Sequence, residues 1–183
     1  KHVVKNLKTS VDTGKISHAY IINGDEGTGK KLLSKIFAKA ILCEGINSPC
    51  DKCASCHSFD NNNNPDVIYV KSDKKTIGVK EVRDQIVDIV DVKPYKYNYK
   101  IFIIENADKM SIAAQNAILK TLEEPPMHAV FILTATNIEL FLPTILSRCV
   151  VVKLRAVNNE QIKDFLIKNK EIDENYAELY AEY

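Results

Sequence analysis

The residues with the clearest capacity for chemistry lie in the stretch GDEGTGKK, at positions 24–31. A glycine-rich turn that ends in lysine is typical of a loop that binds phosphate, because backbone N–H groups converge on the phosphate oxygens and the lysine neutralises their charge. The residues expected to form this cradle are Gly24, Gly27, Thr28, Gly29 and Lys30. A tight turn without phosphate chemistry is the alternative, and the strand and helix expected on either side favour the phosphate loop.

Lys31 departs from this pattern at the position that usually offers a hydroxyl group to Mg²⁺. An ammonium group cannot ligate a cation. A second departure follows the apolar run 101–104, where a nucleotide hydrolase carries one acidic residue for the metal and one for the attacking water. Here Glu105 can still reach toward a metal, but Asn106 cannot accept a proton. We therefore expect a degenerate nucleotide site that does not hydrolyse ATP. Neutral drift in a working enzyme is the alternative, and the sequence leaves open whether ATP and Mg²⁺ bind at all.

Four of the five cysteines are clustered, which in a cytosolic chain points to metal ligation before disulfides. They are Cys43, Cys50, Cys53 and Cys56. Four thiolates satisfy the tetrahedral coordination of Zn²⁺, so we expect a closed structural zinc site. Free buried thiols would leave the clustering unexplained, and a redox C-x-x-C would need a thioredoxin-like setting with one dominant pair. His57 could replace one sulfur, whereas Cys149 is expected in the core.

The elements that must position these residues alternate between short apolar runs and helical patterns. Strands are expected at 18–23, 66–70, 100–106, 129–136 and 149–154. Helices are expected at 30–43, 79–90 and 111–124. The first of these helices carries an apolar stripe formed by Leu32, Leu33, Ile36, Phe37, Ala40 and Ile41. Strands that alternate with helices predict an α/β fold, in which a parallel sheet is flanked by helices on both faces.

Composition restricts the class of protein further. The chain has 183 residues, of which 45% are hydrophobic, so it can bury a sizeable core. Its 25 basic and 24 acidic residues give a net charge of +1, which argues against a global field that attracts nucleic acid or membrane. No apolar run approaches the roughly 18 residues of a membrane-spanning helix. We expect a soluble, cytoplasmic protein without a membrane partner.

The character of the sequence changes near position 155. Residues 1–155 are expected to form the phosphate-loop domain, with the zinc module at 43–56 inserted in it. Beyond it, Asn158 and Gln161 resemble the capping box of a helix, and a second amphipathic segment continues to Tyr183. We interpret 156–183 as the start of a small helical lid subdomain, cut from a longer protein.

Four stretches together carry a resemblance to a known family: KISHAYIINGDEGTGKK, the pattern C-x6-C-x2-C-x2-C, NADKMSIAAQNAILKTLEEPP and LPTILSRC. They resemble the delta-prime subunits of the bacterial clamp loader, AAA+ proteins of the DNA polymerase III holoenzyme. The resemblance is strong from 18 to 154. The ATP-hydrolysing gamma or tau subunits of that family carry Lys-Thr and Asp-Glu at the two departing places. Lys31 and the Glu105–Asn106 pair therefore point to delta-prime, with a gamma or tau subunit as the alternative.

This resemblance implies further residue roles and partners. From the sequence alone Arg148 would be a solvated arginine, but in the SRC motif of the family it is an arginine finger that acts in trans on a neighbour's ATP. Thr136 and Asn137 resemble the sensor of a bound γ-phosphate. The resemblance implies a stator beside the delta subunit and the gamma or tau ATPases, in a complex that loads the sliding clamp onto primed DNA. A collar domain absent from this chain would join the subunits. A small-molecule phosphotransferase is a third hypothesis, for which the sequence offers neither an acceptor-binding lid nor a catalytic carboxylate.

Overall fold

The computed structural model describes residues 2–72 and 74–156 of the chain. A five-stranded sheet crosses it in the order β2-β3-β4-β1-β5, and every neighbouring pair of strands is parallel. The strands are β1 (Ala19–Asn23), β2 (Val67–Val70), β3 (Lys100–Ile104), β4 (Ala129–Ala135) and β5 (Val150–Lys153). All five lie within the ranges predicted from the sequence. The lid subdomain expected at 156–183 lies outside the described residues, apart from its first residue.

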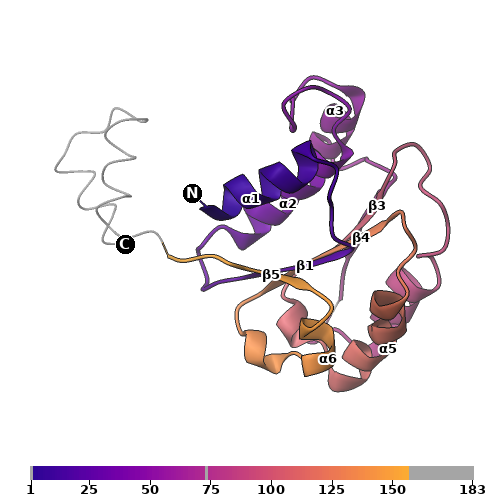
Figure 1. Cartoon of the computed structure of the whole chain (residues 1–183). Coiled ribbons are helices and arrows are strands. Elements are labelled where there is room, and N and C mark those ends of the chain that lie inside the picture. The colour runs from indigo at the N-terminus through magenta and orange to yellow at the C-terminus, as the bar shows by residue number, and fades with distance from the viewer. Residues whose placement is uncertain (1, 73, 157–183) are drawn as a thin grey trace.

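Helices cover both faces of the sheet, which confirms the predicted α/β architecture (Figure 1). One face carries α1 (His2–Asp12), α2 (Lys30–Leu42) and α3 (Ala54–Asp60). The opposite face carries α5 (Ile112–Glu123) and α6 (Pro143–Leu146), with α4 (Val79–Val82) and the π-helical turn η1 (Arg83–Val87) packed against α5. Short 3₁₀ turns follow β3 and β4, namely η2 (Ala107–Lys109) and η3 (Ile138–Leu140).

Alternate side chains of each strand enter two hydrophobic cores, one on each face of the sheet. Phe102 and Phe131 face α5 and stack with their ring centroids 5.1 Å apart. The next residues along the strands, Ile103 and Ile132, face α2 instead. Every residue of β3 and β4 is buried, as expected for central strands covered on both sides. The rigid centre of the sheet thus fixes the loops that follow β1, β3 and β4.

The buried face of α2 differs from the predicted stripe. Leu32 and Ile36 are 63% and 43% exposed, whereas Ala38 is fully buried. The inward side of α2 also includes buried Ser34. Small residues there let the helix lie close to the strands, so a search for large apolar side chains selects the wrong edge of the helix. The prediction is wrong for Leu32 and Ile36, and the other four residues of the stripe are buried or partly buried.

Three helical segments also differ from expectation. The sequence predicts neither α1 nor α3, and the helix expected at 79–90 is α-helical over four residues before it widens into η1. The start of α3 is capped by a thiol, since the sulfur of Cys53 accepts a hydrogen bond from the N–H of Cys56 at 3.4 Å. Cysteine is not one of the residues that usually cap the N-terminus of a helix, so the sequence does not reveal where α3 begins. Within the described residues no helix combines the length and apolar character needed to cross a membrane.

Candidate phosphate-binding site and cysteine cluster

The expected phosphate loop connects the end of β1 to the start of α2. Gly29 is the N-cap of α2 and has a φ angle of 81°, a left-handed conformation that glycine adopts without strain. No side chain caps the first N–H groups of α2, so they can face an anion. A cavity of about 510 Å³ adjoins the loop. Its lining includes the predicted residues Gly27, Thr28, Gly29, Lys30, Lys31, Asn106 and Thr136.

The Lys30 side chain is folded back against the loop and is 8% exposed. Its Nζ donates hydrogen bonds to the carbonyl oxygens of Gly24, at 2.5 Å, and Asp25, at 2.7 Å. The hydroxyl of Thr136 lies 3.4 Å away, at the end of β4. Binding a phosphate would require this ammonium group to exchange loop carbonyls for phosphate oxygens. Lys30 thus lines the cavity, but its ammonium group is bonded to loop carbonyls in this conformation.

Lys31 and Glu105, the two positions that depart from the hydrolase pattern, form an ion pair. Nζ of Lys31 lies 2.8 Å from Oε2 of Glu105, with side chains that are 58% and 29% exposed. Lys31 belongs to the first turn of α2, and Glu105 directly follows β3. A magnesium site here would need a hydroxyl group and free carboxylate oxygens. Because an ammonium group already contacts the carboxylate, these residues do not fit Mg²⁺.

The turn after β3 fixes the end of β4. Asn106 has a φ angle of 51°, and its N–H donates to the hydroxyl of Thr134 at 3.0 Å. The Oδ2 atom of Asp108 accepts bonds of 3.0 Å from the N–H groups of both Thr136 and Asn137. The two sensor-like residues direct their side chains to different places. Thr136 lines the phosphate-loop cavity, whereas the side chain of Asn137 caps the start of η3.

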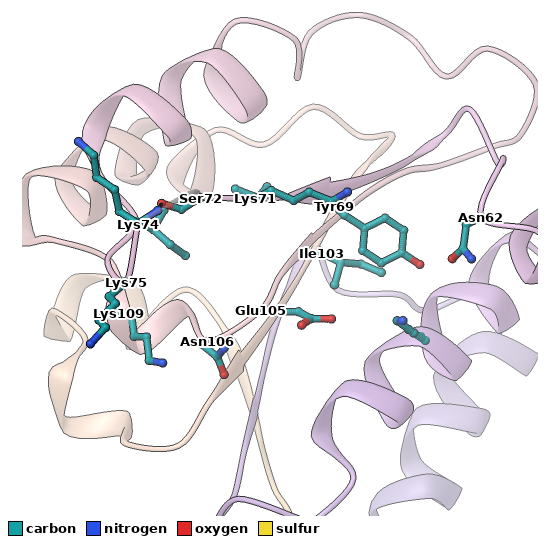
Figure 2. Close-up of a pocket in the computed structure, with 13 residues that line it drawn as sticks. Asn62, Tyr69, Lys71, Ser72, Lys74, Lys75, Ile103, Glu105, Asn106 and Lys109 are labelled. Atoms are coloured by element: carbon teal, nitrogen blue, oxygen red, sulfur yellow. Dashed lines mark hydrogen bonds between the residues drawn. The ribbon is translucent and has the colours of Figure 1, made fainter.

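A second cavity, of about 650 Å³, adjoins the first and shares Asn106 and Lys109 with it (Figure 2). Five lysines line it, namely Lys35, Lys71, Lys74, Lys75 and Lys109. The carboxylate of Glu105 points into the same space as the ring of Tyr69 (Figure 2). Burial and this nearby carboxylate raise the pKa of the Tyr69 hydroxyl. These lysines cannot be grouped from the sequence, because they come from separate segments that share no motif.

The four predicted cysteines converge into one cluster between α2 and α3. Their sulfur atoms all lie within 4.8 Å of one another, and those of Cys43 and Cys53 are 4.0 Å apart. Ligands at about 2.3 Å from a tetrahedral ion are roughly 3.8 Å apart, so the cluster fits a bound metal. Gly45 makes this packing possible, because a side chain there would lie 2.6 Å from the sulfur of Cys50. The predicted alternative ligand, His57, is exposed and lies outside the cluster.

Backbone N–H groups support two of the sulfur atoms. Burial acts to raise the pKa of Cys53, but the N–H groups of Cys56 and Glu44 and the neighbouring thiols lower it to about 6. The pKa of Cys43 is also lowered against the effect of burial, because the N–H groups of Gly45 and Cys50 point at its sulfur. Burial, together with the adjacent sulfurs, raises the pKa of Cys56 to about 12. The cluster therefore already holds part of the negative charge that a cation needs.

Arg148 lies apart from this arrangement. Arg148 is not one of the described residues that line either cavity. Its Nη2 lies 2.8 Å from Oε1 of Glu123 at the end of α5, and its Nη1 donates to the carbonyl oxygen of Thr144 at 2.8 Å. This acidic partner belongs to the EEPP stretch, and the sequence alone gives no reason to pair it with Arg148. Arg148 is thus held at the surface between α5 and α6, away from the phosphate loop of its own chain.

Known proteins resemble this chain in sequence. A family model described as "DNA polymerase III, delta subunit" matches residues 1–158. The chain belongs to this delta-type clamp-loader family. The tau subunit of DNA polymerase III from Bacillus subtilis (strain 168) is 41% identical over 164 residues, which cover 88% of this chain and 29% of that protein. The delta' subunit from the same strain is 31% identical over 180 residues, which cover 98% of this chain and 54% of that protein.

These clamp-loader relatives do not select one subunit type. The chain spans between 29% and 54% of the length of the two curated relatives. The solved structure of a gamma subunit-related protein from Thermotoga maritima superposes with a TM-score of 0.67 at 24% identity, covering 96% of this chain and 56% of that one. RuvB from the same organism gives 0.63 at 14% identity, covering 98% and 53%. Both structural matches support the fold, and the delta-prime assignment remains a hypothesis.

Proposed function

We propose that the chain is part of a delta-prime-type subunit of a bacterial DNA polymerase III clamp loader and does not hydrolyse ATP itself. Its partners would be the delta subunit and the gamma or tau ATPases, in a complex that loads the sliding clamp onto primed DNA. The observation that carries the proposal is the 2.8 Å contact between Lys31 and Glu105. Hydrolysis needs a hydroxyl group, a metal ion and a proton acceptor at this place, and the chain offers an ion pair and Asn106 instead.

Arg148 is the residue that would act on another subunit. Its side chain is 33% exposed, with Glu123 as an exchangeable partner. Arginine is the side chain best suited to bind a phosphate through two parallel hydrogen bonds. In the assembled complex it would leave Glu123 for the γ-phosphate of the neighbouring ATP and stabilise the charge that develops during transfer.

The cysteine cluster would bind Zn²⁺ as a structural ion. The four sulfur atoms exhaust a tetrahedral coordination sphere, which leaves no position for a substrate. The metal would supply folding free energy to the segment between α2 and α3, and no catalytic step depends on it.

The test is an ATPase assay on the clamp loader assembled with this protein in the form in which the cell makes it. Arg148→Ala should slow hydrolysis at the neighbouring site by about 10³–10⁵-fold, the usual worth of an arginine finger. Lys30→Ala should leave the rate of the complex nearly unchanged, and Arg83→Ala, which removes an exposed arginine from η1, is the matched control. Unchanged turnover with Arg148→Ala, or ATP hydrolysis by the isolated protein that Lys30→Ala abolishes, would overturn the proposal.

A gamma- or tau-type ATPase is the second candidate. The 41% identity to the Bacillus subtilis tau subunit, above the 31% to the delta' subunit, favours it. The same assay on the isolated protein separates the two, because an ATPase subunit hydrolyses ATP with its own Lys30.

A further inference from the structure

We propose that the ammonium group of Lys31 permanently takes the place of the divalent cation, so that the phosphate loop binds the phosphates of a nucleoside di- or triphosphate without Mg²⁺. This inference deepens the proposed function and rests on its claim that the site lacks a catalytic metal. It assigns Lys31 and Glu105 as the residues that determine the cation requirement of the site.

The ion pair occupies both protein positions from which a phosphate-loop site holds its metal. One position is the residue after the loop lysine, in the first turn of the helix, and the other is the acidic residue that ends the neighbouring apolar strand. Here these are Lys31 and Glu105, whose side chains meet at 2.8 Å. Lys30 and Lys31 are consecutive, yet their ammonium groups bind different partners, the loop carbonyls and the strand end. A metal that bound Glu105 would have to displace the Lys31 ammonium group, which stays tethered beside the carboxylate.

The Lys31 ammonium group can still serve a phosphate. It has three N–H donors, and the ion pair with Glu105 uses one of them. The pair is 58% and 29% exposed at its two side chains, and a pair so exposed to solvent adds little to folding stability. We therefore expect the ion pair to affect ligand binding in the cavity, which Lys31 lines together with Lys30 and Lys109.

The surrounding lysines carry the positive charge that a bound metal would otherwise supply. Three ammonium groups and one carboxylate, that of Glu26, line the phosphate-loop cavity. Glu105 lines the neighbouring cavity, whose lysines include Lys74 and Lys75 (Figure 2). The whole chain carries a net charge of +1, so this concentration of lysines is local. Fixed ammonium groups at this edge of the sheet can neutralise a phosphate chain that elsewhere arrives with its own Mg²⁺.

The experiment measures equilibrium binding of fluorescent ADP, and of a non-hydrolysable fluorescent ATP analogue, in excess Mg²⁺ and in EDTA at constant ionic strength. We expect the wild-type protein to bind each nucleotide at least as tightly in EDTA as in excess Mg²⁺. Lys31→Thr restores the hydroxyl group and frees Glu105. Its affinity should fall by about tenfold or more in EDTA and recover on addition of Mg²⁺. Lys80→Thr removes one exposed lysine from α4 and should behave as wild type.

A tenfold gain in wild-type affinity on adding Mg²⁺, at about 1.4 kcal/mol, would overturn the inference. So would the absence of nucleotide binding in both conditions, or a Lys31→Thr protein that binds equally with and without metal. None of these results touches the role proposed for Arg148, which the ATPase rate of the assembled complex measures. Conversely, hydrolysis by the isolated protein would remove the proposed function whatever the metal dependence of binding.

Discussion

The cysteine cluster and the phosphate-loop site handle positive charge in opposite ways. The cluster provides ligands alone: four sulfur atoms within 4.8 Å, two of them with lowered pKa values. The phosphate-loop site provides a cation of its own, the Lys31 ammonium group, placed 2.8 Å from the carboxylate of Glu105. The first site offers a set of ligands that fits a metal ion. The second holds an ammonium group where a phosphate-loop site places a metal ligand.

The largest effect on the difference between the two regions is expected from loss of a cysteine ligand. Cys56→Ser replaces a fully buried sulfur with a hydroxyl group that binds zinc poorly. We expect the zinc content to fall from about one ion per chain to a small fraction of that, because the remaining sulfurs cannot close the tetrahedron. Elemental analysis gives the metal content, and amide hydrogen exchange reports whether the segment 43–60 opens. Cys149→Ser is the matched control, and zinc-free wild-type protein prepared without chelator would contradict the assignment.

On the phosphate-loop side, the largest effect is expected from Asp108→Ala. The change leaves the N–H groups of Thr136 and Asn137 without their acceptor, which should lower the free energy of unfolding by about 1–3 kcal/mol. Urea-induced unfolding measures the loss, and Asp91→Ala, at an exposed position, provides the comparison. Because Thr136 would also lose its fixed position, nucleotide affinity should drop in parallel. Equal stability of the two variants would show that the turn after β4 does not depend on this carboxylate.

Lys39 joins the two regions, since it lies on α2 and its Nζ contacts Asp51 at 2.6 Å and Asp60 at 2.8 Å. Burial acts to lower the pKa of Lys39, but its ion pairs with the two aspartates outweigh this and raise the pKa. The stabilisation is therefore complete below the ordinary lysine pKa of 10.5 and is lost as the pH rises through the higher folded value. Lys39→Met should cost about 1 kcal/mol, seen as faster amide exchange in the cysteine module. Lys52→Met removes an exposed lysine of the same module, and an equal effect there would argue against the specific role of Lys39.

The smallest effect concerns Cys149, the thiol outside the cluster. Burial raises its pKa to about 12, from an ordinary value of 9.0. The thiol is thus protonated at neutral pH, and the stability linked to this proton is present below pH 9 and lost as the pH approaches 12. A thiol reagent at pH 8 should modify Cys149 slowly in the folded protein and rapidly in denaturant. Fast modification without denaturant would contradict its burial.

The local parts of both sites could be predicted from sequence, and the contacts between distant segments could not. The five strands, the helices α2 and α5, the glycine loop and the four clustered cysteines all follow from residues close together in the chain. Lys31 and Glu105, in contrast, are 74 positions apart (105 − 31), and from the sequence they are two independent departures. Their contact depends on the packing of α2 against the sheet, to which Ser34 and Ala38 contribute by being small. In the same way, Glu123 becomes a partner of Arg148 because α5 and α6 pack together, which no motif states.

A single helix connects the phosphate-loop site and the cysteine cluster. α2 begins at the phosphate loop with Lys30 and ends one residue before Cys43, a rod of 13 residues that is about 20 Å long. It is tied to the cysteine module by Lys39 and has no proline or glycine at which it could bend. Because α2 is one continuous helix, the position of its first turn at the phosphate loop also sets where Cys43 stands at its other end.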